Sequence, residues 1–161
     1  MDALTAIHTA LSLVALVAGI VVVIGLLGTR LLPLWSALYF VTAVATSATG
    51  FLFPSSTFMA SHWIGVISLV VLALAIVARY RLALAGAWRW IYVAGTVIGA
   101  YFLVFVTIAQ AFKKLPALMA AAPTLSEPPF ALSQLAALLL FVVAGIAAAR
   151  LFRPGAVQGL A

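Results

Sequence analysis

Charge is scarce in this chain, because only eight basic and two acidic residues occur among 161. Four uncharged stretches result, at residues 3–29, 31–78, 90–112 and 128–149. About 18 or more consecutive apolar residues indicate a helix that crosses a bilayer. With 68% hydrophobic residues, the chain also exceeds the roughly 45–50% that is usual in soluble domains. These features exclude a soluble fold and predict an all-α integral membrane protein.

Cysteine is absent, which excludes disulfides and thiolate metal ligands. Charged residues fall only at the ends of the predicted helices, so we expect no proton relay, ion pair or carboxylate pair within the membrane. The basic residues lie at helix ends without interleaved aromatics, so nucleic acid is not a predicted partner. Gly-rich phosphate loops and hydrolase motifs are also missing. We therefore expect the chain to have no enzymatic activity of its own.

The uncharged stretches predict a bundle of five transmembrane helices in a single domain, residues 1–161. The longest stretch must contain two helices, because about 20 residues span the hydrocarbon. The Pro-Ser-Ser-Thr segment at 54–57 divides it, and Ser61 is expected to cap the helix that follows. In the only long loop, residues 115–122 predict a short surface helix, and Ser126 is expected to cap the last span. The five predicted spans cover residues 4–27, 34–53, 62–78, 88–112 and 129–151.

Five crossings would place the two ends of the chain on opposite sides of the membrane. Loops rich in Lys and Arg stay in the cytoplasm, so the more basic side identifies the inside. We therefore predict a multi-pass protein of the cell inner membrane, with the N-terminus outside and the C-terminus cytoplasmic. A four-helix arrangement, in which the first or last helix does not insert, remains an alternative. One side carries Arg30, Arg79, Arg81, Arg89, Arg150 and Arg153, and the other carries Lys113, Lys114, Asp2 and Glu127.

Each predicted helix carries small or polar residues at helical spacing, which is typical of faces that contact other helices. The clearest example is Gly95 with Gly99, a Gly-x-x-x-Gly motif that lets another helix approach closely. Contact within the bundle and contact with a second copy of the chain both remain open. The predicted partners are accordingly the lipid bilayer and either the chain itself or another membrane protein.

Most of the strong hydrogen-bonding side chains fall in the outer half of the predicted bundle. An outward-facing polar pocket that binds a small ligand is the functional interpretation. The structural alternative is that the hydroxyls bond back to helix carbonyls and the amides tie helix ends together. The residues concerned are Ser12, Thr46, Thr49, Ser68, Thr107, Gln110 and Gln134.

Two histidines, His8 and His62, lie at similar depth near the outer ends of the first and third helices. Both helices start outside, so the two imidazoles would meet if these helices were neighbours. Facing imidazoles can ligate haem iron axially or share a metal ion. The alternative is that His62 is a helix-start residue at headgroup level. Haem bound by His8 and His62 is therefore one hypothesis for the site.

Several short segments carry a recognisable pattern: Ile7-His8-Thr9-Ala10, Gly28-Thr29, Ala37-Leu38-Tyr39 leading to Thr49-Gly50, and Tyr92-Val93 through Gln110-Ala111-Phe112. Together they resemble a family of uncharacterised bacterial multi-helix inner-membrane proteins that look like small relatives of membrane cytochromes. In that family a histidine and a basic residue follow the Gly-Thr pair, whereas residues 30–35 supply no histidine here. The resemblance implies a membrane helix bundle and brings no activity with it.

Three hypotheses for function follow from these features. The first is a polytopic membrane protein without catalysis that serves as an accessory, packing or small-ligand-binding component. The second is a haem- or metal-binding, redox-associated membrane protein. The third is a small permease for a neutral or hydrophobic solute, because a bundle without buried charge suits no ion.

Overall fold

The computed structural model describes residues 3–53 and 60–153, and this part of the chain is helical without any strand. The predicted all-α fold class is therefore confirmed. Each predicted span has a corresponding helix whose ends lie within three residues of the predicted ones, and the predicted surface helix is also present. The 54–57 break and the side chain of Ser61 lie outside the described residues. The helices are α1 (Ala3–Leu27), α2 (Pro33–Gly50), α3 (Ala60–Tyr80), α4 (Trp88–Lys114), α5 (Pro116–Ala121) and α6 (Pro128–Leu151).

Four of the helices are long and apolar enough to cross a membrane: α1, α3, α4 and α6. Helix α2 differs from them, because it has 18 residues and carries several serines and threonines. At 1.5 Å per residue it is about 27 Å long, slightly less than the roughly 30 Å of bilayer hydrocarbon. Its length and composition therefore leave it at the lower limit for a span.

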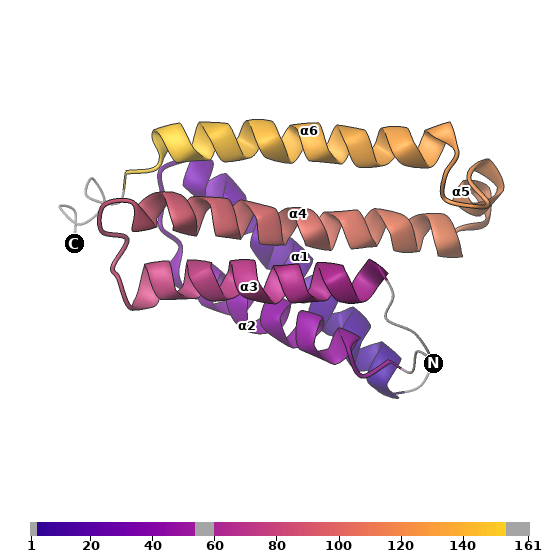
Figure 1. Cartoon of the computed structure of the whole chain (residues 1–161), viewed down its shortest axis with the longest axis horizontal. Coiled ribbons are helices and arrows are strands. Elements are labelled where there is room, and N and C mark those ends of the chain that lie inside the picture. Colours follow the sequence, from indigo (N-terminus) through magenta and orange to yellow (C-terminus); the bar gives the residue numbers. More distant parts are fainter. Residues whose placement is uncertain (1–2, 54–59, 154–161) are drawn as a thin grey trace.

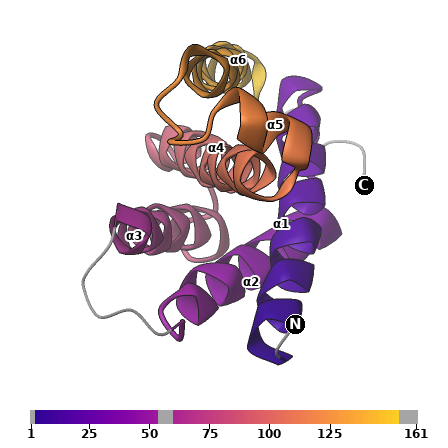
Figure 2. The same cartoon turned by 90° about the vertical axis from the view of Figure 1, so that its right-hand side faces the viewer.

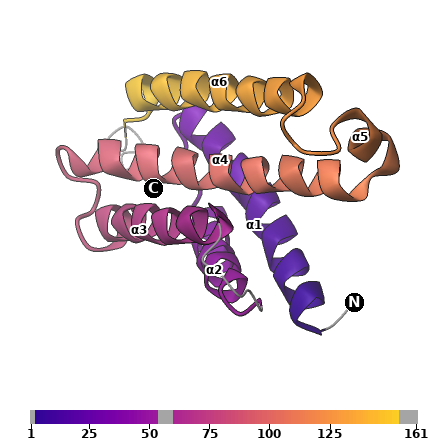
Figure 3. The ribbon, with the colours of Figure 1, turned by 45° about the vertical axis from the view of Figure 1, so that its right-hand side comes forward.

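The long helices alternate in direction along the chain. Figure 1 shows α3, α4 and α6 side by side, with α1 and α2 behind them at a slant. Viewed end-on in Figure 2, α4 lies between α3 and α6, and α1 passes on another side of α4. In Figure 3 the oblique crossing of α1 behind α4 is visible. As a result α1 begins at one end of the bundle and α6 finishes at the opposite end.

Helices α1, α2 and α4 meet around Tyr39, whose side chain is fully buried. Glycine makes room for this ring on both neighbouring helices. A Cβ on Gly19 would lie 2.9 Å from the ring, and one on Gly99 would overlap the tyrosine hydroxyl. That hydroxyl donates to the backbone oxygen of Thr96 at 3.1 Å. The small residues therefore allow a large side chain to be buried with its polar atom hydrogen-bonded.

Gly95 and Gly99 lie on the face of α4 that contacts α2 and α3 of the same chain. A Cβ on Gly95 would approach the Ala75 Cβ to 2.8 Å and the backbone oxygen of Val71 to 2.9 Å. A Cβ on Gly99 would lie 2.9 Å from Leu72 Cδ2. A side chain on Gly95 would therefore require α3 to move, and one on Gly99 would require Tyr39 and Leu72 to shift.

Helix α6 is the most peripheral of the long helices. Ala137 and Ala148 are its only buried residues, and large side chains such as Leu140 and Val143 are 66% and 64% exposed. An apolar surface of this kind suits contact with lipid. The helix therefore joins the bundle through α4 and, more weakly, through α1.

The start of α6 differs from the predicted cap at Ser126. The N-cap residue is Glu127, and no side chain caps the first turn. Pro128 and Pro129 occupy that turn and have no N–H to offer, so a capping side chain would find few donors. The Glu127 carboxylate instead accepts hydrogen bonds from the backbone amides of Thr124 and Ser126, which stabilise the preceding turn.

Candidate functional site

The two histidines have separate partners in the structure. His8 Nδ1 lies 2.9 Å from the Thr49 hydroxyl on α2, and its ring packs edge-on against Phe53 at 5.1 Å between centroids. His62 packs against Phe51, with 5.6 Å between ring centroids. Each imidazole therefore contacts the C-terminal end of α2 or the residues just after it.

Helix α2 packs against both α1 and α3, whereas direct packing of α1 on α3 is marginal. The condition for a shared haem or metal site between His8 and His62, that their helices be neighbours, is thus not met by the described helices. Nor do these residues include any group of three or more His, Cys, Asp or Glu side chains placed to hold a metal ion. Haem ligation by the two histidines stays a prediction without geometric support.

The predicted polar pocket residues use most of their hydrogen bonds locally. Ser12, Thr49 and Thr107 each donate to the carbonyl oxygen one turn earlier in their own helix, at 2.7 to 2.8 Å. Such back-bonding satisfies a hydroxyl within a membrane helix without any ligand. These contacts favour the structural interpretation of the polar residues over a ligand pocket.

The remaining pocket residues do not converge either. Thr46 and Ser68 are buried on α2 and α3, and the Thr46 hydroxyl has no hydrogen-bond partner in the described part of the chain. Gln110 on α4 is exposed. Gln134 on α6 donates from Nε2 to the Phe105 carbonyl oxygen at 3.1 Å, which ties α6 to α4. The predicted set is thus divided between the α1–α2–α3 side and the α4–α6 side of the bundle.

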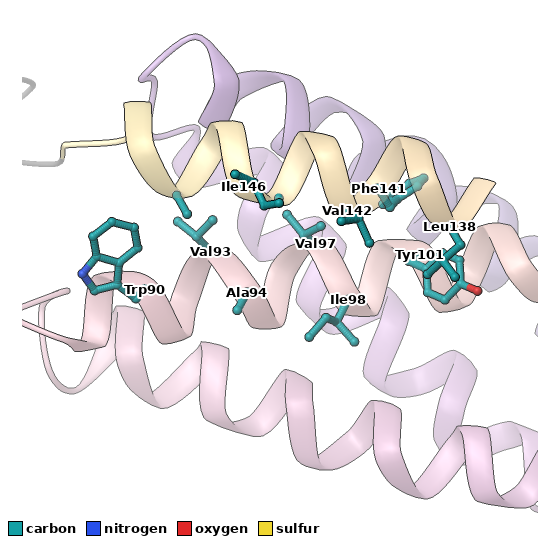
Figure 4. Close-up of a pocket in the computed structure, with 12 residues that line it drawn as sticks. Trp90, Val93, Ala94, Val97, Ile98, Tyr101, Leu138, Phe141, Val142 and Ile146 are labelled. Atoms are coloured by element: carbon teal, nitrogen blue, oxygen red, sulfur yellow. The ribbon is translucent and has the colours of Figure 1, made fainter. Parts of the chain in front are cut away.

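An apolar groove of about 380 Å³ lies between α4 and α6 (Figure 4). Small residues, among them Ala94, Gly145 and Ala149, leave the space open, and larger apolar side chains form the walls. The only polar side-chain atoms in the lining belong to Trp90 and Tyr101. The lining residues are Trp90, Val93, Ala94, Val97, Ile98 and Tyr101 of α4, and Leu138, Phe141, Val142, Gly145, Ile146 and Ala149 of α6.

The groove runs along the outer surface of the bundle. On α4 it extends from Trp90 to Tyr101, which is about 16 Å at 1.5 Å per residue. This length is close to half of the roughly 30 Å hydrocarbon thickness. Ile98, Val142 and Ile146 are 40 to 50% exposed, so the groove opens towards the surroundings of the bundle and not into its core.

Several arginines gather at the end of the bundle where the groove ends at Trp90. The Arg89 guanidinium carbon lies 4.1 Å from the Trp90 ring centroid, and Arg89 Nη1 donates to the Phe152 carbonyl oxygen at 2.8 Å. Arg150 is in the last turn of α6 and is exposed. Arg89 and Arg150 therefore lie beside residues that line the groove.

On the core side of α4, Arg79 stacks against two aromatic rings. Its guanidinium carbon lies 5.2 Å from the Tyr80 centroid and 5.6 Å from the Tyr92 centroid. The Tyr92 hydroxyl is 3.2 Å from the Ser36 hydroxyl. The Nε and Nη1 atoms of Arg79 are buried and have no hydrogen-bond partner among the described residues. Cation–π contact therefore stabilises this charge at the end of α3.

Sequence reasoning missed the groove. Ala94, Gly145 and Ala149 are the signal that was available, but alanine and glycine occur throughout this chain and mark tight helix contacts as readily as open space.

Comparison with protein-family models, curated proteins and solved structures finds no match for this chain.

Proposed function

We propose that this protein is a non-catalytic accessory component of the inner membrane that binds a hydrophobic ligand in the groove between α4 and α6. The groove is the observation that carries the proposal. Its volume of about 380 Å³ lies within the roughly 300–1,000 Å³ of small-molecule sites. Its lining contains no charged side chain and only two polar side-chain atoms, so the ligand is predominantly apolar.

The shape of the groove favours an extended apolar chain over a compact molecule. It is about 16 Å long by the helical rise between Trp90 and Tyr101, and it is open on one side along the exposed residues Ile98 and Val142. An extended chain can enter such a groove laterally from the bilayer. A lipid or lipid-like molecule is the ligand class that fits this geometry.

The proposed arrangement in the membrane has five spans, with the N-terminus outside and the C-terminus cytoplasmic. The distribution of basic residues supports it: six arginines occur in or beside the α1–α2 and α3–α4 connections and the end of α6, whereas only Lys113 and Lys114 are basic in the α4–α6 connection. Such an asymmetry orients the more basic side inward.

Reporter fusions test this topology. A reporter after the last residue and one within the α4–α6 connection should give opposite compartments, with the C-terminal one cytoplasmic. Two reporters on the same side would reject the five-span arrangement, and a C-terminal reporter outside the cytoplasm would reject the orientation.

Native mass spectrometry of the protein purified in mild detergent tests the groove. We expect the wild-type protein to retain a hydrophobic molecule, and Ala94→Leu to lose it because the leucine fills the groove. Ala73→Leu is the matched control, since Ala73 is an exposed alanine on α3 away from the groove. Equal retention by wild type and Ala94→Leu would contradict the proposal.

The haem-binding and permease hypotheses, and the resemblance to cytochrome-like bacterial membrane proteins, stay predictions. An absorption spectrum of the purified protein distinguishes the first of them at once, because axial histidine ligation gives an intense Soret band. The band should disappear in His8→Ala if the hypothesis holds.

A further inference from the structure

The groove between α4 and α6 ends beside arginines, and this juxtaposition bears on what the groove binds. Trp90 and Ala149 line that end, and Arg89 and Arg150 are their neighbours in the chain. The Arg89 guanidinium carbon lies 4.1 Å from the Trp90 ring centroid, so the charge is in contact with a wall of the groove. The apolar groove therefore ends at a positively charged side chain.

These arginines have unused hydrogen-bond donors. Arg89 donates from Nη1 to Phe152, and this is its only hydrogen bond among the described residues. Arg150 has no hydrogen bond within that part of the chain and is exposed. A guanidinium has five N–H donors in a planar arrangement that matches phosphate. Most of the donors of both side chains are thus available to a ligand.

In the part of the chain that the structure describes, no acidic side chain lies at this end of the bundle. Its only acidic residues are Asp2 and Glu127. Glu127 precedes α6 and so lies at the other end of that helix from Arg150, and Asp2 precedes α1, which begins at the same end as α6. Among the described residues, no acidic side chain is therefore placed to pair with Arg89 or Arg150, and an anionic ligand can supply the counter-charge.

Building on the proposed function of the groove, we infer that its occupant is one acyl chain of an anionic glycerophospholipid, whose phosphate is bound by Arg89 and Arg150. The groove length of about 16 Å corresponds to one leaflet of the roughly 30 Å hydrocarbon. The lipid therefore belongs to the leaflet on the arginine side. Trp90, at the junction of groove and charge, lies at the depth where tryptophan meets headgroups.

Titration of the purified full-length protein with two lipids tests the inference. Phosphatidylglycerol and phosphatidylcholine with identical dioleoyl chains differ only in the headgroup, which is anionic in the first and zwitterionic in the second, and native mass spectrometry reports binding of each. We expect wild type to prefer phosphatidylglycerol. Arg89→Gln and Arg150→Gln should each weaken its binding about fivefold, given the usual contribution of one basic residue near an anionic lipid. They should weaken phosphatidylcholine binding less, because the choline cation already offsets the charge of that phosphate.

Arg81→Gln is the matched control, because Arg81 is exposed at the same end of the bundle and neither it nor its chain neighbours line the groove. It should leave the preference unchanged. An equal loss in Arg81→Gln and Arg150→Gln would overturn the inference, because the preference would then reflect overall charge.

Failure of the headgroup inference and failure of the groove have different signatures. If Ala94→Leu removes both lipids but the wild type binds them equally, the groove stands and anionic recognition is rejected. If Ala94→Leu retains phosphatidylglycerol while Arg150→Gln loses it, the groove function is rejected. Displacement of phosphatidylglycerol by equimolar oleate would identify a free fatty acid as the occupant and overturn the inference. A lipid-free dimer of the chain would identify a second copy as the occupant and overturn it as well.

Discussion

The two faces of α4 use small residues in opposite ways. On one face Gly95 and Gly99 let α3 and Tyr39 approach so closely that even a Cβ would overlap them. On the other face Ala94 lies opposite the glycine and alanine of α6, and the space between the helices stays open. A small residue in a membrane helix therefore indicates either a tight contact or a cavity, depending on how closely the backbone or the side chains of the partner helix approach it.

The difference comes from the residues that the partner helices contribute. Tyr39 of α2 and Leu72 of α3 both extend into the space next to Gly99. Opposite Val97, by contrast, α6 offers Gly145, where an added Cβ would lie 3.2 Å from Val97 Cγ1 and require only a small shift of that side chain. Because lipid is as apolar as a side chain, the open side carries little of the cost that a water-filled gap would impose in a soluble core.

Substitution of the tight-face glycines should have the largest effect. In Gly99→Leu the added side chain overlaps Tyr39 and Leu72, and overpacking of this kind costs about 1–3 kcal/mol or more. For a chain of this size we expect the melting temperature in detergent to fall by roughly 5–10 °C. Gly95→Leu should behave similarly because it meets Ala75. Wild-type melting temperatures for both would contradict the tight contact.

Two controls accompany this measurement. Gly145→Ala on the open side should change the melting temperature by less than about 2 °C, because the gain in helix propensity offsets a small adjustment of Val97. Leu103→Ile on α4, which exchanges side chains of nearly equal volume, should also have little effect. If Gly145→Ala and Gly99→Leu were equally damaging, the two faces of α4 would not differ as the structure indicates.

Removal of a tyrosine hydroxyl should also lower the melting temperature more on the core face of α4 than on the groove face, but by a smaller amount. Tyr39→Phe removes the hydrogen bond to Thr96 in the core, and such bonds within membranes contribute about 0.6–1 kcal/mol. Tyr101 lines the groove, and its hydroxyl has no hydrogen bond among the described residues. We expect Tyr39→Phe to lower the melting temperature by roughly 2–3 °C and Tyr101→Phe to leave it unchanged. The reverse order would place the hydrogen-bonded tyrosine on the wrong face.

The smallest effect concerns pH, at the turn that leads into α6. Desolvation raises the pKa of the Glu127 carboxyl, but hydrogen bonds from Thr124 and from the Ser126 amide outweigh it, and the pKa lies below its ordinary value. Because its pKa is lower in the folded state, the ionised Glu127 carboxylate stabilises the folded protein at pH values above the unfolded-state pKa of about 4.3. This stabilisation is lost as the pH falls through the folded-state pKa. Between about pH 5 and pH 3 the wild-type melting temperature should fall slightly more than that of Glu127→Gln. Parallel pH profiles would show that the turn contributes nothing.

The long helices were predictable because their signal is local. The uncharged stretches and the charges that flank them delimit the long helices directly. The polar pocket and the groove depend on how helices pair, which no single stripe encodes. From the sequence, the hydroxyls of Ser12 and Thr107 could equally contact a ligand or bond back to their own helix. Only the structure shows that both donate to a carbonyl oxygen one turn earlier.

The shallow attachment of α6, with only Ala137 and Ala148 buried, has a consequence for biosynthesis. Chains are made from the N-terminus, so α1 to α4 can assemble around Tyr39 while α6 is still being translated. In the proposed membrane arrangement, a nascent chain at this stage presents Val93 and Val97 to lipid instead of water. Helix α6 is then a late addition, and its arrival completes the groove without disturbing the core already in place.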